Sequence, residues 1–264
     1  MTRAVFLRAR SLKAKAAREA EILSAAAHLA TAKGVREVAM TAIADEVGMH
    51  KSAMLRYFET REDIFLRLAA TAWHDGSAEA RDRLKETAPW PDTASKEWDE
   101  TAHSIASELA QSLVARPLFC DLLAHTPLDL ERNVSTDTVR TFKKGAIAEV
   151  ERTADTLSAI TPLEADQARA VVTTATSIAG ALWQVAAPGT QLHAFYESDP
   201  ELSHSVVDVE PRLTDILTAL LTGYAIGSSR PTGNPRATPL PPDRHRCHGF
   251  NYPSVVDRAA PSRW

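Results

Sequence analysis

Short polar and basic side chains cluster in residues 34–61, GVREVAMTAIADEVGMHKSAMLRYFETR. Met54 and Phe58 are four residues apart, so in a helix they share the inner face. The basic Lys51 and Arg56 then point outward. Cationic side chains on a short exposed helix donate hydrogen bonds to phosphate oxygens and to base edges in the major groove. The chemistry indicated is therefore non-covalent recognition of duplex DNA.

Two short helices at a steep angle would have to position this face. Ile43, Ala44 and Val47 share one side of the first helix, and Ala44 is small enough for close helix packing. Gly48 supplies the backbone freedom for the turn between the helices. The pattern predicts a helix-turn-helix, although an ordinary helical hairpin would use similar residues.

Other reactive side chains give weaker patterns. Cys120 and His125 could suggest a thiol nucleophile and its base, but their spacing defines no attack geometry and no oxyanion-hole motif accompanies them. His245, Cys247 and His248 lie close together without a fold to orient metal ligands. The sequence therefore predicts no catalytic residue, no metal site and no cofactor.

The segment from Arg18 to Leu68 resembles the DNA-binding domain of TetR-family transcriptional regulators. The motifs that carry the resemblance are EILSAAAHLATAKG, IADEVG and MLRYFETREDIFLRL. Residues 116–143, RPLFCDLLAHTPLDLERNVSTDTVRTFK, are also similar to one group of C-terminal domains in that family. The resemblance implies an all-α protein in which a small DNA-binding domain precedes a larger helical domain.

The same resemblance implies which residues meet DNA. Lys51 matches a family position that faces bases, and Arg61 matches a family position that binds phosphate. Three residues depart from the family pattern, since Ala39 replaces a capping Thr or Ser, Leu55 replaces a Tyr and His50 replaces a Ser. The full expected DNA-binding set is Thr41, His50, Lys51, Ser52, Ala53, Leu55, Arg56, Tyr57 and Arg61.

Charge is distributed unevenly along the chain. The net charge is −4 over 264 residues, yet residues 1–68 carry twelve Lys or Arg against eight Asp or Glu. The first 18 residues hold six basic side chains and no acid, which suits an arm that follows phosphates; a solvated disordered end is the alternative. The expected domains are a basic arm (1–17), the helix-turn-helix domain (18–65), a regulatory and dimerisation domain (66–226) and a disordered tail (227–264).

Pro and Gly divide the remaining sequence into helices. We expect helices at 61–87, 95–115, 117–125, 136–160, 163–187 and 212–226, with a loop before Pro211. The last of these carries an apolar stripe of six large residues: Leu213, Ile216, Leu217, Leu220, Leu221 and Tyr224. The tail after Gly227 is rich in Pro and Arg and poor in aliphatic residues, which predicts disorder.

The resemblance also implies how such a protein works. The helices 163–187 and 212–226 would pair with those of a second copy, and the homodimer would read a palindromic operator. The middle helices would enclose a small-molecule effector, whose expected contacts are His103, Phe119, His125, Phe142 and Trp183. The interpretation is a ligand-responsive repressor of the cytoplasm with no membrane partner. A ligand-independent architectural DNA-binding protein and a helical enzyme using Cys120 and His125 are the alternatives.

Overall fold

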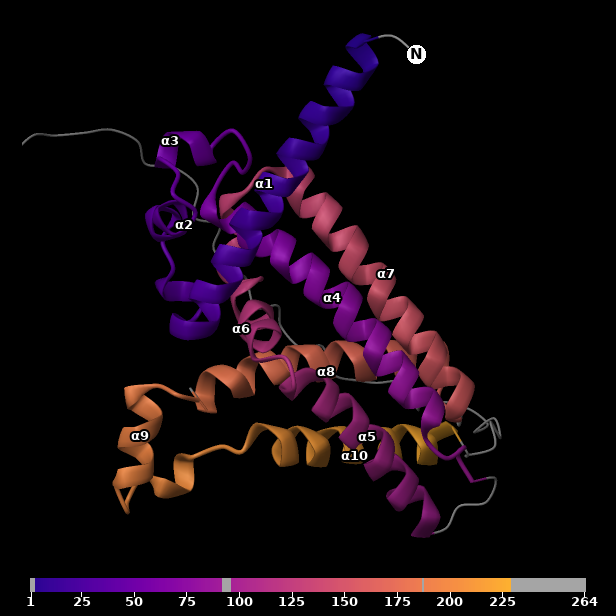
Figure 1. Cartoon of the computed structure of the whole chain (residues 1–264). Coiled ribbons are helices and arrows are strands. Elements are labelled where there is room, and N and C mark those ends of the chain that lie inside the picture. Colours follow the sequence, from indigo (N-terminus) through magenta and orange to yellow (C-terminus); the bar gives the residue numbers. More distant parts are fainter. Residues whose placement is uncertain (1–2, 92–95, 187, 229–264) are drawn as a thin grey trace, which may run out of the picture. The chain divides into compact units, whose positions relative to one another are not determined.

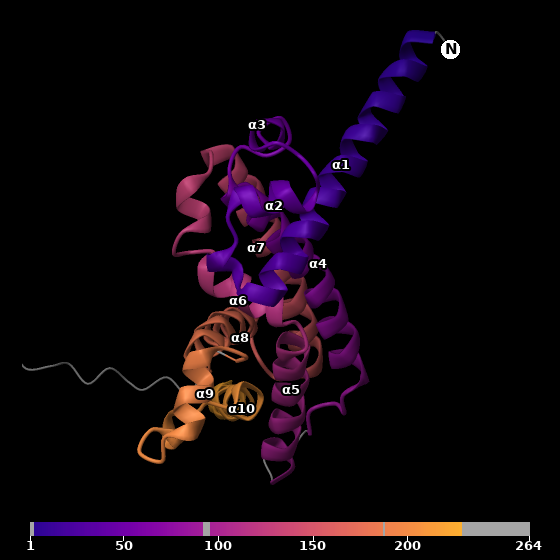
Figure 2. The same cartoon turned by 60° about the vertical axis from the view of Figure 1, so that its left-hand side comes forward.

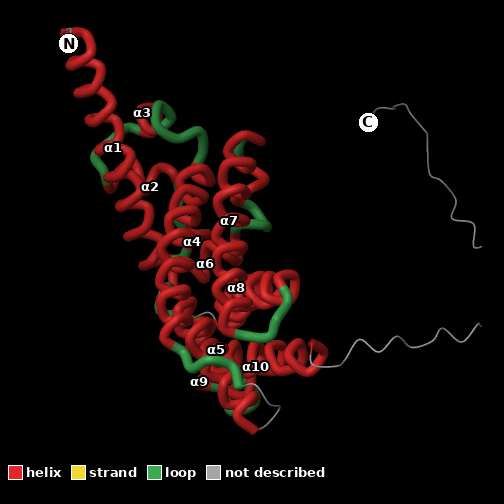
Figure 3. Tube along the Cα trace, turned by 90° about the vertical axis from the view of Figure 1, so that its right-hand side faces the viewer, coloured by secondary structure: helices red, strands yellow, loops and turns green. Residues whose placement is uncertain are grey.

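The computed structural model describes residues 3–91, 96–186 and 188–228 (Figure 1). Within these ranges it contains α-helices, short 3-10 turns and loops, and no strand (Figure 3). The expected all-α class is confirmed. The sequence predicts a disordered tail from residue 227, but Gly227 and Ser228 belong to the last helix; the rest of the tail, including His245, Cys247 and His248, lies outside the described residues. The helices are α1 (Arg3–Lys33), α2 (Met40–Glu46), α3 (Lys51–Met54), α4 (Arg61–Glu86), α5 (Lys96–Val114), α6 (Pro117–His125), α7 (Thr136–Ile160), α8 (Ala165–Ala186), α9 (Gln191–Ser198) and α10 (Val209–Ser228).

The segment expected as a separate basic arm is the first half of α1. This helix runs without interruption from Arg3 to Lys33. Its first half consists mainly of Ala, Arg, Lys and Leu, which are strong helix formers, and it contains no Pro or Gly. Local propensity therefore extends the helix beyond the part that packs on the domain.

Side-chain caps fix the starts of the two longest later helices. The Oγ1 atom of Thr60 accepts the backbone N–H of Asp63 at 3.1 Å, which caps α4. In the same way the Oγ atom of Ser135 accepts the N–H of Thr138 at 3.3 Å at the start of α7. The observed bounds of α4 and α7 agree closely with those predicted from the sequence because these caps are local signals.

Long helices enclose the core of the C-terminal part. Helices α4 and α7 pack side by side, α6 and α7 contact α8, and α10 lies against both α5 and α8 (Figures 1 and 2). Most of the buried apolar side chains form one continuous cluster that extends from Ile22 of α1 to Leu221 of α10. The DNA-binding and regulatory parts therefore share a core at their junction.

The C-terminal helices differ from the expectation in two ways. Leu213, Leu217 and Leu221 are fully buried within the protomer, so much of the α10 stripe is core and not free surface. The segment expected to be a loop before Pro211 contains α9, none of whose residues is buried. Leu192 and Phe195 of this helix are each about half exposed.

No single helix in the described ranges is long and apolar enough to cross a membrane. The uncharged stretch of α8 instead packs inside the protein, with Val171, Ala175 and Ala179 buried. Its small residues allow close approach: a Cβ on Gly180 would lie 2.9 Å from the backbone nitrogen of Ala124 in α6.

Candidate functional site

The helix-turn-helix begins with α2 and a tight turn. Ile43 and Ala44 of α2 are buried, as the sequence predicts. Gly48 has a φ of 64°, a backbone conformation that suits glycine. The N–H of Met49 donates to the carbonyl of Ala44 at 2.8 Å and closes the turn. The turn therefore orients α3 against α2.

The next helix, α3, presents a short polar and basic surface. Met54 and the following Phe58 are fully buried and anchor it to the domain. Its start is capped by His50, whose Nδ1 accepts the N–H of Ser52 at 3.3 Å. His50 stands where the family pattern often has a Ser, and it caps this helix through its ring nitrogen. Exposed residues of the expected DNA-binding set are Thr41, His50, Lys51, Ser52, Leu55 and Arg56, whereas Ala53 and Tyr57 are half-buried.

The side chain of Arg61 makes contacts within the protein that would not be expected of a residue that binds phosphate. Its Nε donates to the carbonyl of Val38 at 2.5 Å, and one Nη donates to the carbonyl of Val35. Its guanidinium also pairs with Glu62 at 3.0 Å and lies over the ring of Phe65, 4.9 Å from the centroid. The side chain is only 16% exposed. Arg61 thus ties the segment before α2 to the start of α4.

A small cavity lies between α4, α5, α6, α7 and α8. Its volume is about 30 Å³, and the ring of Trp73 meets the ring of Phe119 edge-on at 5.5 Å beside it. Phe119 is the only member of the expected effector set that lines it. The complete lining is Trp73, Gly76, Ser77, Ala80, Leu109, Ser112, Leu113, Phe119, Thr153, Val172, Ala175 and Thr176.

Sequence reasoning missed the other lining residues because apolar and small side chains at helical spacing are usually core. One signal was present in the sequence: Gly76, Ser77 and Ala80 form a run of small residues inside α4, where a glycine weakens the helix. The remaining members of the expected effector set lie elsewhere. Phe142 is buried in the core away from the cavity, and His103 is exposed.

A second hollow, a groove of about 860 Å³, lies at the junction of the DNA-binding and regulatory parts. His125 and Trp183 of the expected effector set line this groove together with Lys33 and Arg36. The structure therefore does not bring the expected effector residues together, since one lines the cavity, two line the groove and two line neither.

Asp121 of α6 joins three elements at this junction. One carboxylate oxygen accepts the N–H of Val35, in the turn after α1, at 2.6 Å. The other accepts the side-chain amide of Gln184 in α8 at 2.8 Å, and His125 lies 3.5 Å from it. Hydrogen bonds to a buried carboxylate are among the stronger ones in proteins. This carboxylate holds the DNA-binding part directly to helices of the regulatory part.

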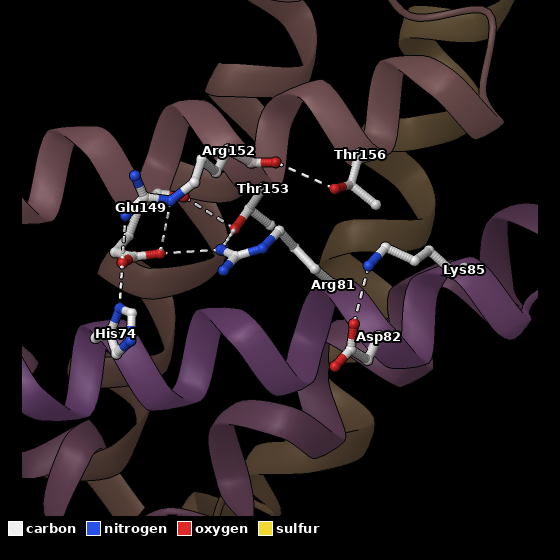
Figure 4. A network of polar contacts seen from close by, with 8 residues as sticks. All are labelled: His74, Arg81, Asp82, Lys85, Glu149, Arg152, Thr153 and Thr156. Atoms are coloured by element: carbon white, nitrogen blue, oxygen red, sulfur yellow. Dashed lines mark hydrogen bonds and ion pairs between the residues drawn. The ribbon is translucent and has the colours of Figure 1, made fainter.

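A buried carboxylate also links α4 to α7 (Figure 4). Glu149 accepts hydrogen bonds from His74 at 2.8 Å, from Arg81 at 2.9 Å and from Arg152 at 2.5 Å. Burial opposes ionisation of Glu149, but the bonds from Arg152, His74 and Arg81 outweigh it and lower its pKa to about 2. Glu149 therefore remains ionised and holds the two helices together.

Cys120 and His125 do not form a catalytic pair. The Sγ of Cys120 is fully buried and donates to the carbonyl of Leu113 at 3.3 Å. Burial, with a smaller contribution from the neighbouring Asp121, raises the pKa of Cys120 to about 12, so its nucleophilic thiolate is suppressed. The ring of His125 lies between the carboxylates of Asp121 and Asp129.

Comparisons with known proteins identify both parts of the chain. Residues 22–68 match the description "Bacterial regulatory proteins, tetR family", and residues 74–227 match "Tetracyclin repressor-like, C-terminal domain". A comparison with curated proteins finds no match.

Several solved structures are similar to the chain. A transcriptional regulator of the TetR/AcrR family from Thermobifida fusca YX-ER1 is 18% identical, with 78% of this chain and 98% of that chain covered and a TM-score of 0.46. Apo ActR from Streptomyces coelicolor is 16% identical, with 80% and 98% covered and a TM-score of 0.48. FadR from Bacillus subtilis in complex with stearoyl-CoA is 15% identical, with 77% and 97% covered and a TM-score of 0.45.

Proposed function

Because the chain belongs to the TetR family of transcriptional regulators, we propose that it represses transcription by binding a palindromic operator as a homodimer and is released by a small molecule. The chain is accordingly a DNA-binding regulator and not an enzyme. The observation that carries the finer proposal is the surface of α3 and of the turn after it, where Lys51, Ser52 and Arg56 are exposed above a fully buried anchor. As a regulator of bacterial DNA it would act in the cytoplasm.

The residues of the α3 surface would have distinct roles. Lys51 and Arg56 carry the positive charge that meets phosphates and base edges, and Ser52 can donate to either. Leu55, which is 54% exposed, offers only an apolar contact such as one with a thymine methyl group. Because the guanidinium of Arg61 already bonds to backbone carbonyls, we assign it to holding the reading unit in place.

Apolar side chains at the C-terminal helices support the homodimer. Val185 of α8 and Ile226 of α10 are each about half exposed, and α9 adds Leu192 and Phe195. Contiguous exposed apolar groups mark association surfaces, and Leu192 and Phe195 lie three residues apart on one face of α9. A dimer would also place two copies of α3 in successive major grooves, about 34 Å apart.

Helix α6 offers a route from the cavity to the DNA-binding part. Phe119 lines the cavity, and Asp121, two residues later on the same helix, accepts the N–H of Val35. A molecule that enlarges the cavity by displacing Phe119 together with α6 would shift the segment that precedes α2. Release by an effector then requires that the effector bind the state in which α6 is displaced more tightly than the state in which it is not. This link favours a ligand-responsive regulator over a purely architectural DNA-binding protein.

Selection of bound duplexes from a random DNA pool tests the proposal. The selected sites should be palindromes bound by two chains, and the affinity should fall steeply as salt rises, because counterions are released when cations meet phosphates. Lys51→Ala should change the selected sequence, whereas Lys85→Ala, which removes an exposed lysine at the far end of α4, should not. Selection of no site, or binding that is independent of salt, would contradict the proposal.

A further inference from the structure

The lining of the cavity defines the chemical class of the effector. We propose that the part of the effector held between α4, α5, α6, α7 and α8 is uncharged and largely apolar, of the size of a single aromatic ring or a short aliphatic chain. This inference rests on the proposed function, because it assigns the cavity to the effector.

The wall of the cavity is apolar. Aromatic rings of Trp73 and Phe119 form one side, and the aliphatic side chains of Leu109, Leu113 and Val172 form others. None of the residues that line the cavity in the described part of the chain is charged. A charged ligand group would therefore lose its hydration and gain no ionic partner, which is a large free-energy cost.

The hydroxyl groups in the wall do not compensate for this. Ser112 donates to the carbonyl of Leu109 at 2.9 Å, Thr153 to that of Glu149 at 2.9 Å and Thr176 to that of Val172 at 3.0 Å. The protons of these three hydroxyls are thus already used by the backbone of the same helix. Their oxygens can still accept a bond from a ligand alcohol, phenol or amide, but they have no proton left for a carboxylate or phosphate. Ser77 is the remaining lining hydroxyl, and one neutral hydroxyl does not replace the hydration of a charged group.

The nearest cations are also occupied. Arg81 contacts the cavity-lining Thr153 at 3.4 Å, but its guanidinium donates to Glu149 at 2.9 Å. Arg116, which packs beside the cavity-lining Gly76, donates to Glu79 at 2.6 Å. An anionic ligand would have to displace a carboxylate of the protein from either arginine. The arrangement therefore disfavours anions even at the edge of the cavity.

The size of the cavity limits the effector and connects it to regulation. About 30 Å³ has room for little more than a water molecule, whereas a cavity that holds benzene measures roughly 150 Å³. The walls must therefore move to admit even one ring. The edge-on contact of Trp73 with Phe119 forms part of the wall. Movement of Phe119 together with α6 would link entry of the ligand to the bond between Asp121 and Val35.

Three probes that share one ring and differ in charge test this inference: benzyl alcohol, benzoate and benzylammonium. Their binding to the full-length protein is measured by calorimetry at neutral pH. We expect benzyl alcohol to bind at one site per chain, and both ions to bind at least tenfold more weakly. Ala175→Val, which adds two methyl groups to the lining, should weaken the binding of benzyl alcohol at least tenfold. Thr176→Val, which removes a hydroxyl already used by the backbone, should leave the affinity for benzyl alcohol within about threefold of that of the parent protein.

The outcomes separate this inference from the proposed function. Benzoate or benzylammonium binding as tightly as the alcohol, or the absence of binding by all three probes, would overturn the inference. Operator binding measured without any probe tests the proposed function independently of the inference about the effector. Circular dichroism of both variants shows whether they fold, and equal losses for Ala175→Val and Thr176→Val would also count against the assigned site.

Discussion

Replacement of Gly180 by alanine should destabilise the protein through one contact between α6 and α8. The new Cβ would lie 2.9 Å from the backbone nitrogen of Ala124, 3.2 Å from its Cα and 3.2 Å from the carbonyl carbon of Leu123. These neighbours are backbone atoms, so no side chain can rotate away and the two helices must separate. Forcing a methyl group into a well-packed core costs about 1–3 kcal/mol, and the better helix propensity of alanine offsets about 0.5–1 kcal/mol of this. For a protein of this size the net loss of about 0.5–2 kcal/mol corresponds to a fall of roughly 1–8 °C in Tm.

Gly145 of α7 supplies a matched control. It is exposed within its helix, and a Cβ there would meet no atom within 4 Å. Gly145→Ala should therefore stabilise the helix by about 0.5–1 kcal/mol, because alanine loses less backbone entropy than glycine. Both variants are melted at the same protein concentration, because dimerisation makes Tm depend on concentration. A Gly180→Ala protein that melts at or above the parent temperature would refute the close contact between α6 and α8.

Three further results are expected. Arg61→Ala should weaken binding to all DNA sequences alike and lower Tm, whereas Lys51→Ala should mainly change base preference; equal sequence-blind losses without a change in Tm would contradict these roles. Because the pKa of Glu149 is lowered from 4.5 to about 2, its ionisation stabilises the fold above pH 4.5 and this contribution is lost as the pH falls toward 2. Glu149→Gln should therefore lower Tm at neutral pH by the equivalent of about 3 kcal/mol, and the Tm of this variant should depend less on pH between pH 4.5 and 2. A variant whose Tm falls with acid as steeply as that of the parent would exclude this role for Glu149. Asp121→Asn should weaken operator binding severalfold while the exposed Asp82→Asn leaves it unchanged, and identical affinities would show that the Val35 bond does not hold the reading unit.

Local sequence signals predicted most of the helices and the helix-turn-helix. Thr60 and Ser135 cap their helices through side chains three residues from their partners, so the starts of α4 and α7 depend only on neighbouring residues. The buried pair Met54 and Phe58 follows from helical spacing in the same way. Helix α9 was missed because its eight residues give only a short periodic pattern, Leu192, Phe195 and Tyr196, and none of them is buried in the core.

The sequence by itself determined that the chain is helical and which of its faces is basic, because both follow from residues within one or two turns of each other. Only the tertiary structure decided the partners of Asp121 and Arg61. The bond from Val35 to Asp121 joins residues 86 positions apart, and the bond from Arg61 to Val38 spans 23. The cavity likewise exists only where five helices meet, and the burial of Leu213, Leu217 and Leu221 depends on α5 and α8. Such contacts depend on how whole helices pack, which no local pattern of residues specifies.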